Sequence, residues 1–203
     1  PVIMDNYMRS ASRLFASDTP LYLCRGNHEY RGNDAIKYLD YWQTSTGKTY
    51  YSVSYGKFFF LFLDSGEDKV ESDVRNLDIM ITDAYVKEEA EWLKRTLESD
   101  ECRNASVRIA FCHMPPDENG WHGNAMVSKY FVPLLNEAGL DLMLCAHIHK
   151  FRLDKPGTTG ADFPVLCNAN QQRLDCHVDD NGISIDIFDK SGTKVHSLKF
   201  GIH

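Results

Sequence analysis

The stretch VRIAFCHMP, residues 107–115, decides the fold class, because an apolar strand ends in it directly at a histidine. Six residues of strand character precede His113, and Pro115 then stops the strand. Two other segments have the same form. Gly26-Asn27-His28-Glu29 follows the apolar residues 21–24, and Ala146-His147-Ile148-His149 follows the apolar residues 142–145. Since α/β folds build their sites at the carboxyl ends of strands, we expect these side chains to meet in one cleft.

The remaining pattern predicts one α/β domain that spans residues 1–203. Apolar spacing predicts helices over residues 6–15, 33–42, 82–97 and 127–138, with Asn33 as an N-cap and Gly139 after the last helix. Strands are predicted over residues 21–24, 107–112 and 141–145, and a β-hairpin over residues 49–63 turns at Gly56. Strands near residues 163–167, 183–188 and 194–200, with turn signals between the last two and before them, predict a β-meander at the C-terminal end.

Composition excludes several classes of protein. Hydrophobic residues make up 43% of the 203 residues and charged residues 25%, which is ordinary for a globular domain. The net charge of -7 and the absence of a basic run argue against a nucleic-acid footprint, and no apolar run has the length of a membrane span. The six cysteines show no CxxC spacing, so we expect reduced thiols. No targeting segment is visible, and the compartment stays open.

The two histidines of the segment AHIH, residues 146–149, raise a geometric question. In an extended chain, rings that flank a single residue point to opposite sides. Both rings can serve one centre only if the backbone turns there; otherwise they can serve two adjacent metals. A single histidine after a strand is more often a hydrogen-bonded structural residue than a ligand. Three such segments on three strand ends make that interpretation remote.

These segments resemble the motifs of the calcineurin-like metallophosphoesterases, a superfamily that includes the purple acid phosphatases. Residues 26–29 look like its GNHE motif, His113 with Pro115 like its lone-histidine motif, and residues 146–149 like its GHxH motif, with Ala146 in place of the usual glycine. The hairpin around residues 50–65 and the Trp92-Leu93 pair also match. The resemblance implies a two-sheet sandwich flanked by helices, and it extends from about residue 5 to the C-terminus.

The resemblance also implies roles for individual residues. Asn27, His113 and His147 would bind the second of two metal ions, and His149 would bind the first. His28 would act as the catalytic acid that assists the leaving oxygen. Imidazole and amide ligands suit Fe, Mn or Zn. The family hydrolyses phosphate esters, with two metal ions clamping the phosphoryl group and presenting a bridging hydroxide.

The family's first two metal-ligand motifs, Asp-x-His and Gly-Asp-x-x-Asp/Tyr, precede the GNHE segment and have no counterpart among residues 1–25. We therefore expect a domain that lacks its first strands. Metal binding should be weak or absent, because no bridging carboxylate offsets the charge of the ions. Activity should be impaired, and exposed sheet edges should favour self-association.

Two further residues are candidates for substrate binding. His122, in the polar loop of residues 119–124, is placed over the cleft in one interpretation, with Trp121, and on an ordinary surface loop in the other. Arg152, three residues after His149, could contact a phosphate oxygen or lie in solvent. Two rivals to the hydrolase remain open: a non-catalytic binding module that keeps the fold, and a mononuclear metal site completed by a further carboxylate. The sequence does not distinguish between classes of phosphate ester.

Overall fold

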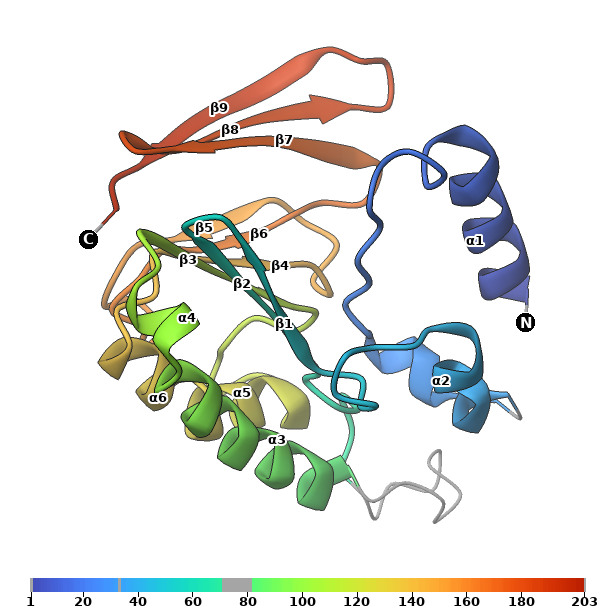
Figure 1. Ribbon diagram of the computed structural model, residues 1–203, viewed down its shortest axis with the longest axis horizontal. Coiled ribbons are helices and arrows are strands. Elements are labelled where there is room, and N and C mark those ends of the chain that lie inside the picture. Colours follow the sequence, from blue (N-terminus) through green and yellow to red (C-terminus); the bar gives the residue numbers. More distant parts are fainter. Residues whose placement is uncertain (1, 33, 71–81, 203) are drawn as a thin grey trace.

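The computed structural model describes residues 2–32, 34–70 and 82–202, and side chains from residue 8 onward within them. Its helices and strands are shown in Figure 1. In chain order they are α1 (Val2–Leu14), η1 (Asn27–Tyr30), η2 (Ala35–Lys37), α2 (Tyr38–Tyr41), β1 (Tyr51–Tyr55), β2 (Phe58–Leu63), α3 (Thr82–Leu97), α4 (Asp100–Arg103), β3 (Val107–Cys112), α5 (His122–Tyr130), α6 (Val132–Glu137), β4 (Leu142–Cys145), β5 (Arg152–Asp154), β6 (Val165–Cys167), β7 (Gln172–Asp179), β8 (Gly182–Asp189) and β9 (Lys194–Phe200).

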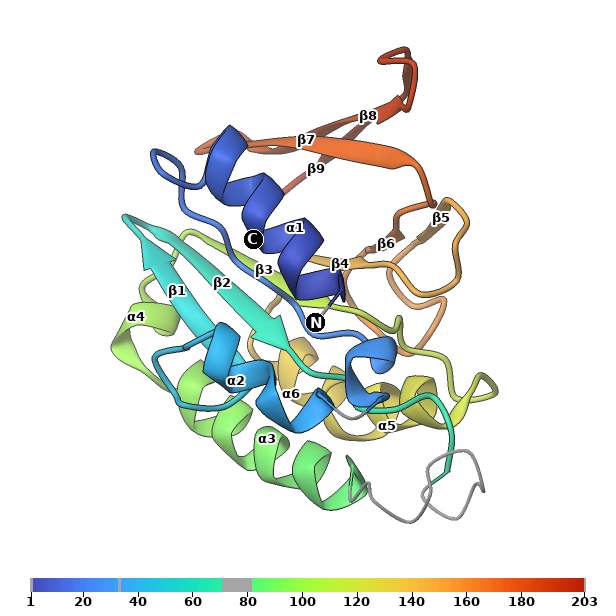
Figure 2. The same cartoon turned by 90° about the vertical axis from the view of Figure 1, so that its right-hand side faces the viewer.

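The strands form two sheets, which confirms the expected two-sheet α/β architecture. The larger sheet has the order β1-β2-β3-β4-β6-β5, and its four central strands are parallel to one another. Strands β1 and β5 pair antiparallel at its two edges. Strands β7, β8 and β9 form the separate antiparallel meander. Helices α3 to α6 cover one face of the larger sheet, and the meander lies over the other face (Figures 1 and 2).

The register of the parallel strands decides which residues leave the sheet together. Leu63 at the end of β2 is paired with Cys112 at the end of β3, and Cys145 at the end of β4 is paired with Cys167 at the end of β6. The carboxyl ends of these strands therefore lie along one edge of the sheet. His113 and the segment of residues 146–149 both begin at this edge.

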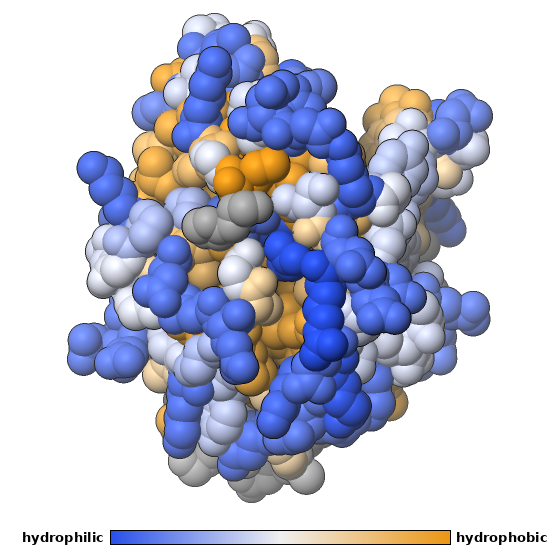
Figure 3. Space-filling model, turned by 60° about the vertical axis from the view of Figure 1, so that its left-hand side comes forward, coloured by the Kyte–Doolittle hydropathy of each residue, from blue (hydrophilic) through white to orange (hydrophobic). Residues whose placement is uncertain are grey.

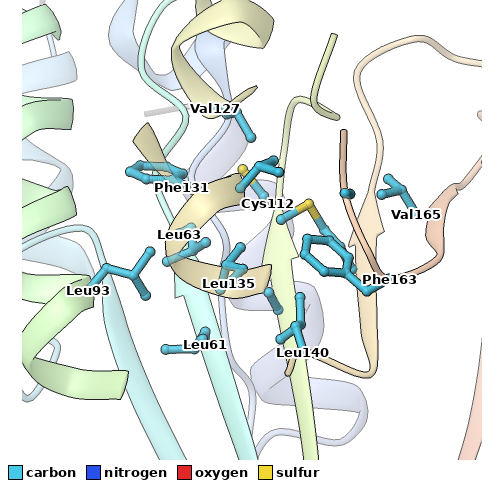
Figure 4. Close-up of a cluster of buried hydrophobic side chains, with 14 of the residues drawn as sticks. Leu61, Leu63, Leu93, Cys112, Val127, Phe131, Leu135, Leu140, Phe163 and Val165 are labelled. Atoms are coloured by element: carbon cyan, nitrogen blue, oxygen red, sulfur yellow. The ribbon is translucent and has the colours of Figure 1, made fainter. Parts of the chain in front are cut away.

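Each face of the sheet has its own apolar core. On the helical face, Leu61 and Leu63 of β2 pack with Leu93 of α3 and with Phe131 and Leu135 around α6 (Figure 4). On the opposite face, residues of β3 and β4 pack against Ile183, Ile185 and Ile187 of β8. Central strands that are buried on both faces are expected to be continuously apolar, as β4 is with the sequence LMLC.

The predicted strand over residues 21–24 is wrong. Residues 20–26 form no strand, and Tyr22 is exposed. The Tyr51 hydroxyl accepts a hydrogen bond from Leu23 N–H at 3.0 Å and donates one to Leu23 C=O at 2.8 Å. Both backbone groups that a neighbouring strand would pair are thus bound by one side chain. The length and apolar character of residues 21–24 fit a strand. A strand also needs a neighbouring strand to pair with, and a short sequence pattern does not show whether one is present.

Several helix boundaries differ from the prediction. The helix expected over residues 33–42 is two short pieces, η2 and α2, and the N-cap expected at Asn33 lies outside the described residues. The helix expected over residues 127–138 begins earlier, at His122, and is divided at Phe131. Pro133 lies in the first turn of α6 and has no N–H for a continuous helix, which explains the division. Strands β5 and β7 were not predicted.

The other expected elements are present. The hairpin of β1 and β2, helix α3, strand β3 and the terminal meander lie where the sequence predicts them. All six cysteines are free thiols. Within the described ranges, no helix combines the length and the apolar character that crossing a bilayer requires. Apolar residues remain visible between polar ones on the face drawn in Figure 3.

Candidate metal centre

Asn27 is held by a tight turn at the start of η1. The Gly26 N–H donates a hydrogen bond to Glu29 Oε2 at 3.0 Å, and the Glu29 N–H donates to Gly26 C=O at 3.2 Å. This capping arrangement satisfies polar groups at the start of the short helix. Asn27 is only 1% exposed, so its amide side chain has a fixed and protected position.

Three of the predicted ligands converge in space. His113 Nε2 lies 3.0 Å from Asn27 Oδ1, and His147 Nδ1 lies 3.3 Å from His113 Nε2. With metal–nitrogen distances of about 2.0–2.1 Å, two ligands of one ion are separated by roughly 3 Å or slightly more. Each of these two pairs of atoms therefore has the spacing of neighbouring ligands around a single ion. They come from η1, from the end of β3 and from the end of β4.

The backbone turns sharply at the histidine pair. His147 and His149 have positive φ angles of 56° and 58°, and the Ile148 N–H donates to Ala146 C=O at 2.6 Å. Residues other than glycine rarely adopt this left-handed conformation, and they cluster at functional sites when they do. The turn is the condition under which both rings could serve one centre, but it does not bring both rings together. It directs His147 toward His113, while His149 is exposed.

The electrostatic environment favours neutral imidazoles. Burial, together with the neighbouring His147, His28 and His149, lowers the pKa of His113 to about 4. Burial also lowers the pKa of His147, although the carboxylate of Asp68 opposes this shift. A neutral imidazole offers the lone pair that a metal ion needs. At neutral pH both rings are therefore in the ligating form.

These residues lie on a cavity of about 800 Å³. Its walls include six of the seven site residues predicted from the sequence: Asn27, His28, His113, His147, His149 and Arg152. Arg152 Nε is 2.9 Å from Asp154 Oδ2. His122 is not among the lining residues, because its Nε2 lies 2.6 Å from Asp83 Oδ1. Its neighbour Trp121 does line the cavity.

A charged cluster on the cavity wall is not among the residues predicted from the sequence. Arg31 contacts Glu67 Oε1 at 2.6 Å and Asp68 Oδ1 at 2.8 Å, and Lys69 Nζ lies 2.7 Å from Asp68 Oδ2. Arg31, Asp68 and Lys69 all line the cavity. Residues 64–69 directly follow β2, so the strand-end rule that identified His113 could have found this segment as well.

No carboxylate is among the converging donor atoms. Throughout residues 2–32, 34–70 and 82–202, no three or more His, Cys, Asp or Glu side chains are grouped in a way that could hold a metal. The converging donors are two imidazoles and one amide oxygen. His147 Nε2 is buried without a hydrogen-bond partner, so this ring has capacity for a further contact. Asp68, one of the two acids that line the cavity, is already paired with Arg31 and Lys69.

Known proteins provide one family match and one distant structural similarity. No curated protein is significantly similar in sequence. One similar solved structure is GAP50, the anchor in the inner membrane complex of Plasmodium, with 14% identity and a TM-score of 0.48 over 76% of this chain. The chain spans about half the length of that protein, since the match covers 53% of it. The family profile of the calcineurin-like phosphoesterases matches residues 3–151. This match covers most of the chain, which therefore belongs to the calcineurin-like phosphoesterase family.

Proposed function

We propose that this chain is a phosphoric ester hydrolase domain in which Asn27, His113 and His147 hold one metal ion. The observation that carries the proposal is the approach of three uncharged donor atoms to 3.0 and 3.3 Å at one edge of the sheet. Membership of the phosphoesterase family supports the type of reaction. A bound ion would supply Lewis-acid polarisation of the phosphoryl group and activation of water.

The surrounding residues have distinct roles in this proposal. His28 is exposed on the cavity wall and donates a proton to the leaving oxygen. Arg152, on the same wall, contacts the phosphoryl oxygens. His149 is the ligand for a second ion in the family pattern. His122 supports the substrate only indirectly, because its ring is bound to Asp83.

Activity of this chain is expected to be impaired. The donor atoms that converge carry no negative charge, whereas an ion of charge +2 or more in a buried site needs compensation. The affinity for Zn²⁺ or Mn²⁺ should therefore be weak. The alternative is a non-catalytic binding module. The same neutral donor set favours it, because a cavity that holds its metal ion weakly can still bind a ligand without the ion.

Metal binding tests the proposal directly. Isothermal titration of Zn²⁺ into the chelator-treated chain should give weak binding of one ion. His113→Ala should weaken it at least about tenfold, since metal affinity depends on each ligand. His177→Ala is the matched control, because the side chain of His177 is 76% exposed and is not among the residues that line the cavity. Equal affinities in wild type and His113→Ala would refute the site.

Hydrolysis of p-nitrophenyl phosphate separates the two functions. Slow, metal-dependent turnover that His28→Ala reduces would support an impaired hydrolase. Absence of metal binding in a folded chain would favour the binding module. Tight, stoichiometric binding with rapid turnover would contradict the expected impairment and would indicate that a carboxylate of this chain completes the site.

Self-association is also part of the proposal. Strands β1 and β5 form the edges of the larger sheet, and Leu14 and Ile36 are 80% and 84% exposed. Strand edges and exposed apolar side chains both promote association. Sedimentation velocity over a range of concentrations should show reversible dimers or larger species. A monomer at all concentrations would contradict this part of the proposal.

A further inference from the structure

Trp121 is unusually exposed for its size. It lines the candidate site, yet 55% of its surface is open to solvent. Large aromatic side chains stabilise cores and interfaces mainly by burying their apolar area. An indole that is exposed beside a cavity can still provide this stabilisation when a ligand covers it. By contrast, Trp92 is largely covered, packing on Tyr50 with 4.9 Å between ring centroids. Part of the indole is thus open to solvent beside the cavity.

The backbone that carries this indole is fixed to the site. The Trp121 N–H donates a hydrogen bond to Asn124 Oδ1 at 3.2 Å, and Asn124 Nδ2 donates to Pro115 C=O at 2.6 Å. Asn124 is only 5% exposed. Pro115 is two residues after His113, so the indole and the metal-ligand segment belong to one hydrogen-bonded unit. Because the backbone that carries the indole is fixed, little of its conformational entropy is lost when a ligand stacks on the ring.

Contacts with two side chains place the indole beside the proposed metal ligands. Its ring is 4.9 Å from the ring of His147, with an interplanar angle of 85°, and Lys69 Nζ lies 4.1 Å from its centroid. The indole is therefore adjacent to His147, one of the proposed metal ligands, and the Lys69 ammonium covers one of its faces. Pro115 and Ile148 continue the apolar wall. A cavity of about 800 Å³ is in the range of sites that bind drug-sized ligands, much larger than phosphate.

We infer that Trp121 is a stacking platform for the leaving group, and that the substrates are phosphate esters whose leaving group carries a planar aromatic ring. This inference rests on the proposed function, because it assumes that the phosphoryl group binds at Asn27, His113 and His147. The aromatic ring lies on the indole while the phosphoryl group lies at the donor atoms. A leaving group that has no ring, such as a polyol, cannot stack on the indole or cover the apolar wall.

Binding of two non-hydrolysable phosphonates tests the inference without relying on turnover. Phenylphosphonate and methylphosphonate are titrated calorimetrically into the zinc-loaded chain. Stacking on an aromatic side chain supports a preference of about tenfold for phenylphosphonate in the wild type. Trp121→Ala should reduce the ratio of the two affinities to about one, and Trp121→Phe should keep part of it. Trp92→Phe, the matched control, should leave the ratio unchanged.

Because the ratio is measured within each variant, a general loss of stability does not imitate the effect. A ratio near one in the wild type, or an unchanged ratio in Trp121→Ala, would overturn the inference and leave the proposed function standing, provided that methylphosphonate binding depends on zinc and on His113. If neither phosphonate binds the wild type, both the inference and the proposed function fail.

Discussion

His113 Nε2 lies 3.0 Å from Asn27 Oδ1, although 86 residues separate them in the chain. The tight turn at Gly26 holds Asn27, and His113 directly follows β3 at the edge of the sheet. No single helix or strand contains both residues, so the site forms only when the sheet is assembled. Changes that disturb the turn or the sheet edge should therefore alter metal binding before they unfold the domain.

Gly26 should be required for the position of His113. A Cβ atom at this residue would lie 2.9 Å from Glu29 Oε2 and 3.0 Å from His113 Nδ1, which is closer than normal contacts. Gly26→Ala should displace the imidazole, lower Zn²⁺ affinity about tenfold and cost roughly 1–3 kcal/mol of unfolding free energy. Calorimetric titration and urea denaturation measure the two effects.

The control for this substitution is Gly201→Ala. Nothing lies within 4 Å of a Cβ atom built there, so zinc affinity and stability should stay near the wild-type values. Wild-type zinc affinity in Gly26→Ala would show that the imidazole can move without loss of the site.

The left-handed backbone at His149 should cost stability. Its φ angle is 58°, and its side chain is exposed, so removal of the ring loses little packing. His149→Gly should be more stable than His149→Ala by roughly 1 kcal/mol, because only alanine keeps the strain of a left-handed residue with a Cβ atom. Urea denaturation of both variants gives the difference.

His177 in strand β7 provides the reversed comparison. Its backbone is an ordinary strand, so His177→Gly should be less stable than His177→Ala. The same order at both positions would show that no strain is stored at His149.

Tyr51 should hold the segment of residues 20–26 to the sheet. Its hydroxyl binds both the N–H and the C=O of Leu23. Tyr51→Phe removes both bonds and should lower the free energy of unfolding by about 1–2 kcal/mol. The Leu23 amide should also exchange its hydrogen faster, which NMR can follow. Tyr55→Phe is the control, since Tyr55 is 75% exposed, and it should change neither quantity. Unchanged exchange at Leu23 in Tyr51→Phe would contradict the role.

Glu89 should make stability depend on pH. It is fully buried, its Oε1 accepts a hydrogen bond from Asp64 N–H at 2.9 Å, and burial followed by the charge of Asp64 raises its pKa well above 4.5. Between pH 4.5 and that raised value the native state binds more protons than the unfolded chain, so the free energy of unfolding falls as pH rises. Asp64, whose pKa burial also raises, contributes with the same sign, and His113 with the opposite sign.

Comparison with Glu89→Gln isolates the contribution of this group. Wild-type stability relative to the variant should decline above pH 4.5 with a slope of up to about 1.4 kcal/mol per pH unit. Denaturant titrations at several pH values give the slope. Glu91→Gln, at an exposed position of the same helix, should follow the wild-type profile. A pH-independent difference between wild type and Glu89→Gln would show that Glu89 ionises in the fold as it does in the unfolded chain.

The sequence by itself determined the elements whose signals are local. Alternating and continuous apolar runs located the β1–β2 hairpin, β3 and β4, and apolar spacing located α3. The segments after β3 and β4 also pointed to His113 and His147 before any contact was known, whereas Asn27 was proposed from the family resemblance and follows a run that forms no strand. Side-chain periodicity and the meeting of parallel strand ends depend on neighbouring residues or on a general property of sheets, so short stretches of sequence carry them.

Only the tertiary structure decided the features that depend on distant partners. The run of residues 21–24 is strand-like, yet Tyr51, 28 residues further along the chain, binds the backbone of Leu23 in place of a strand. Arg31 joins the cavity wall through Glu67 and Asp68, and the left-handed turn at residues 147–149 directs His147 to His113. A sequence pattern shows what a segment can form by itself. The partner that satisfies its polar groups is fixed only when remote segments pack together.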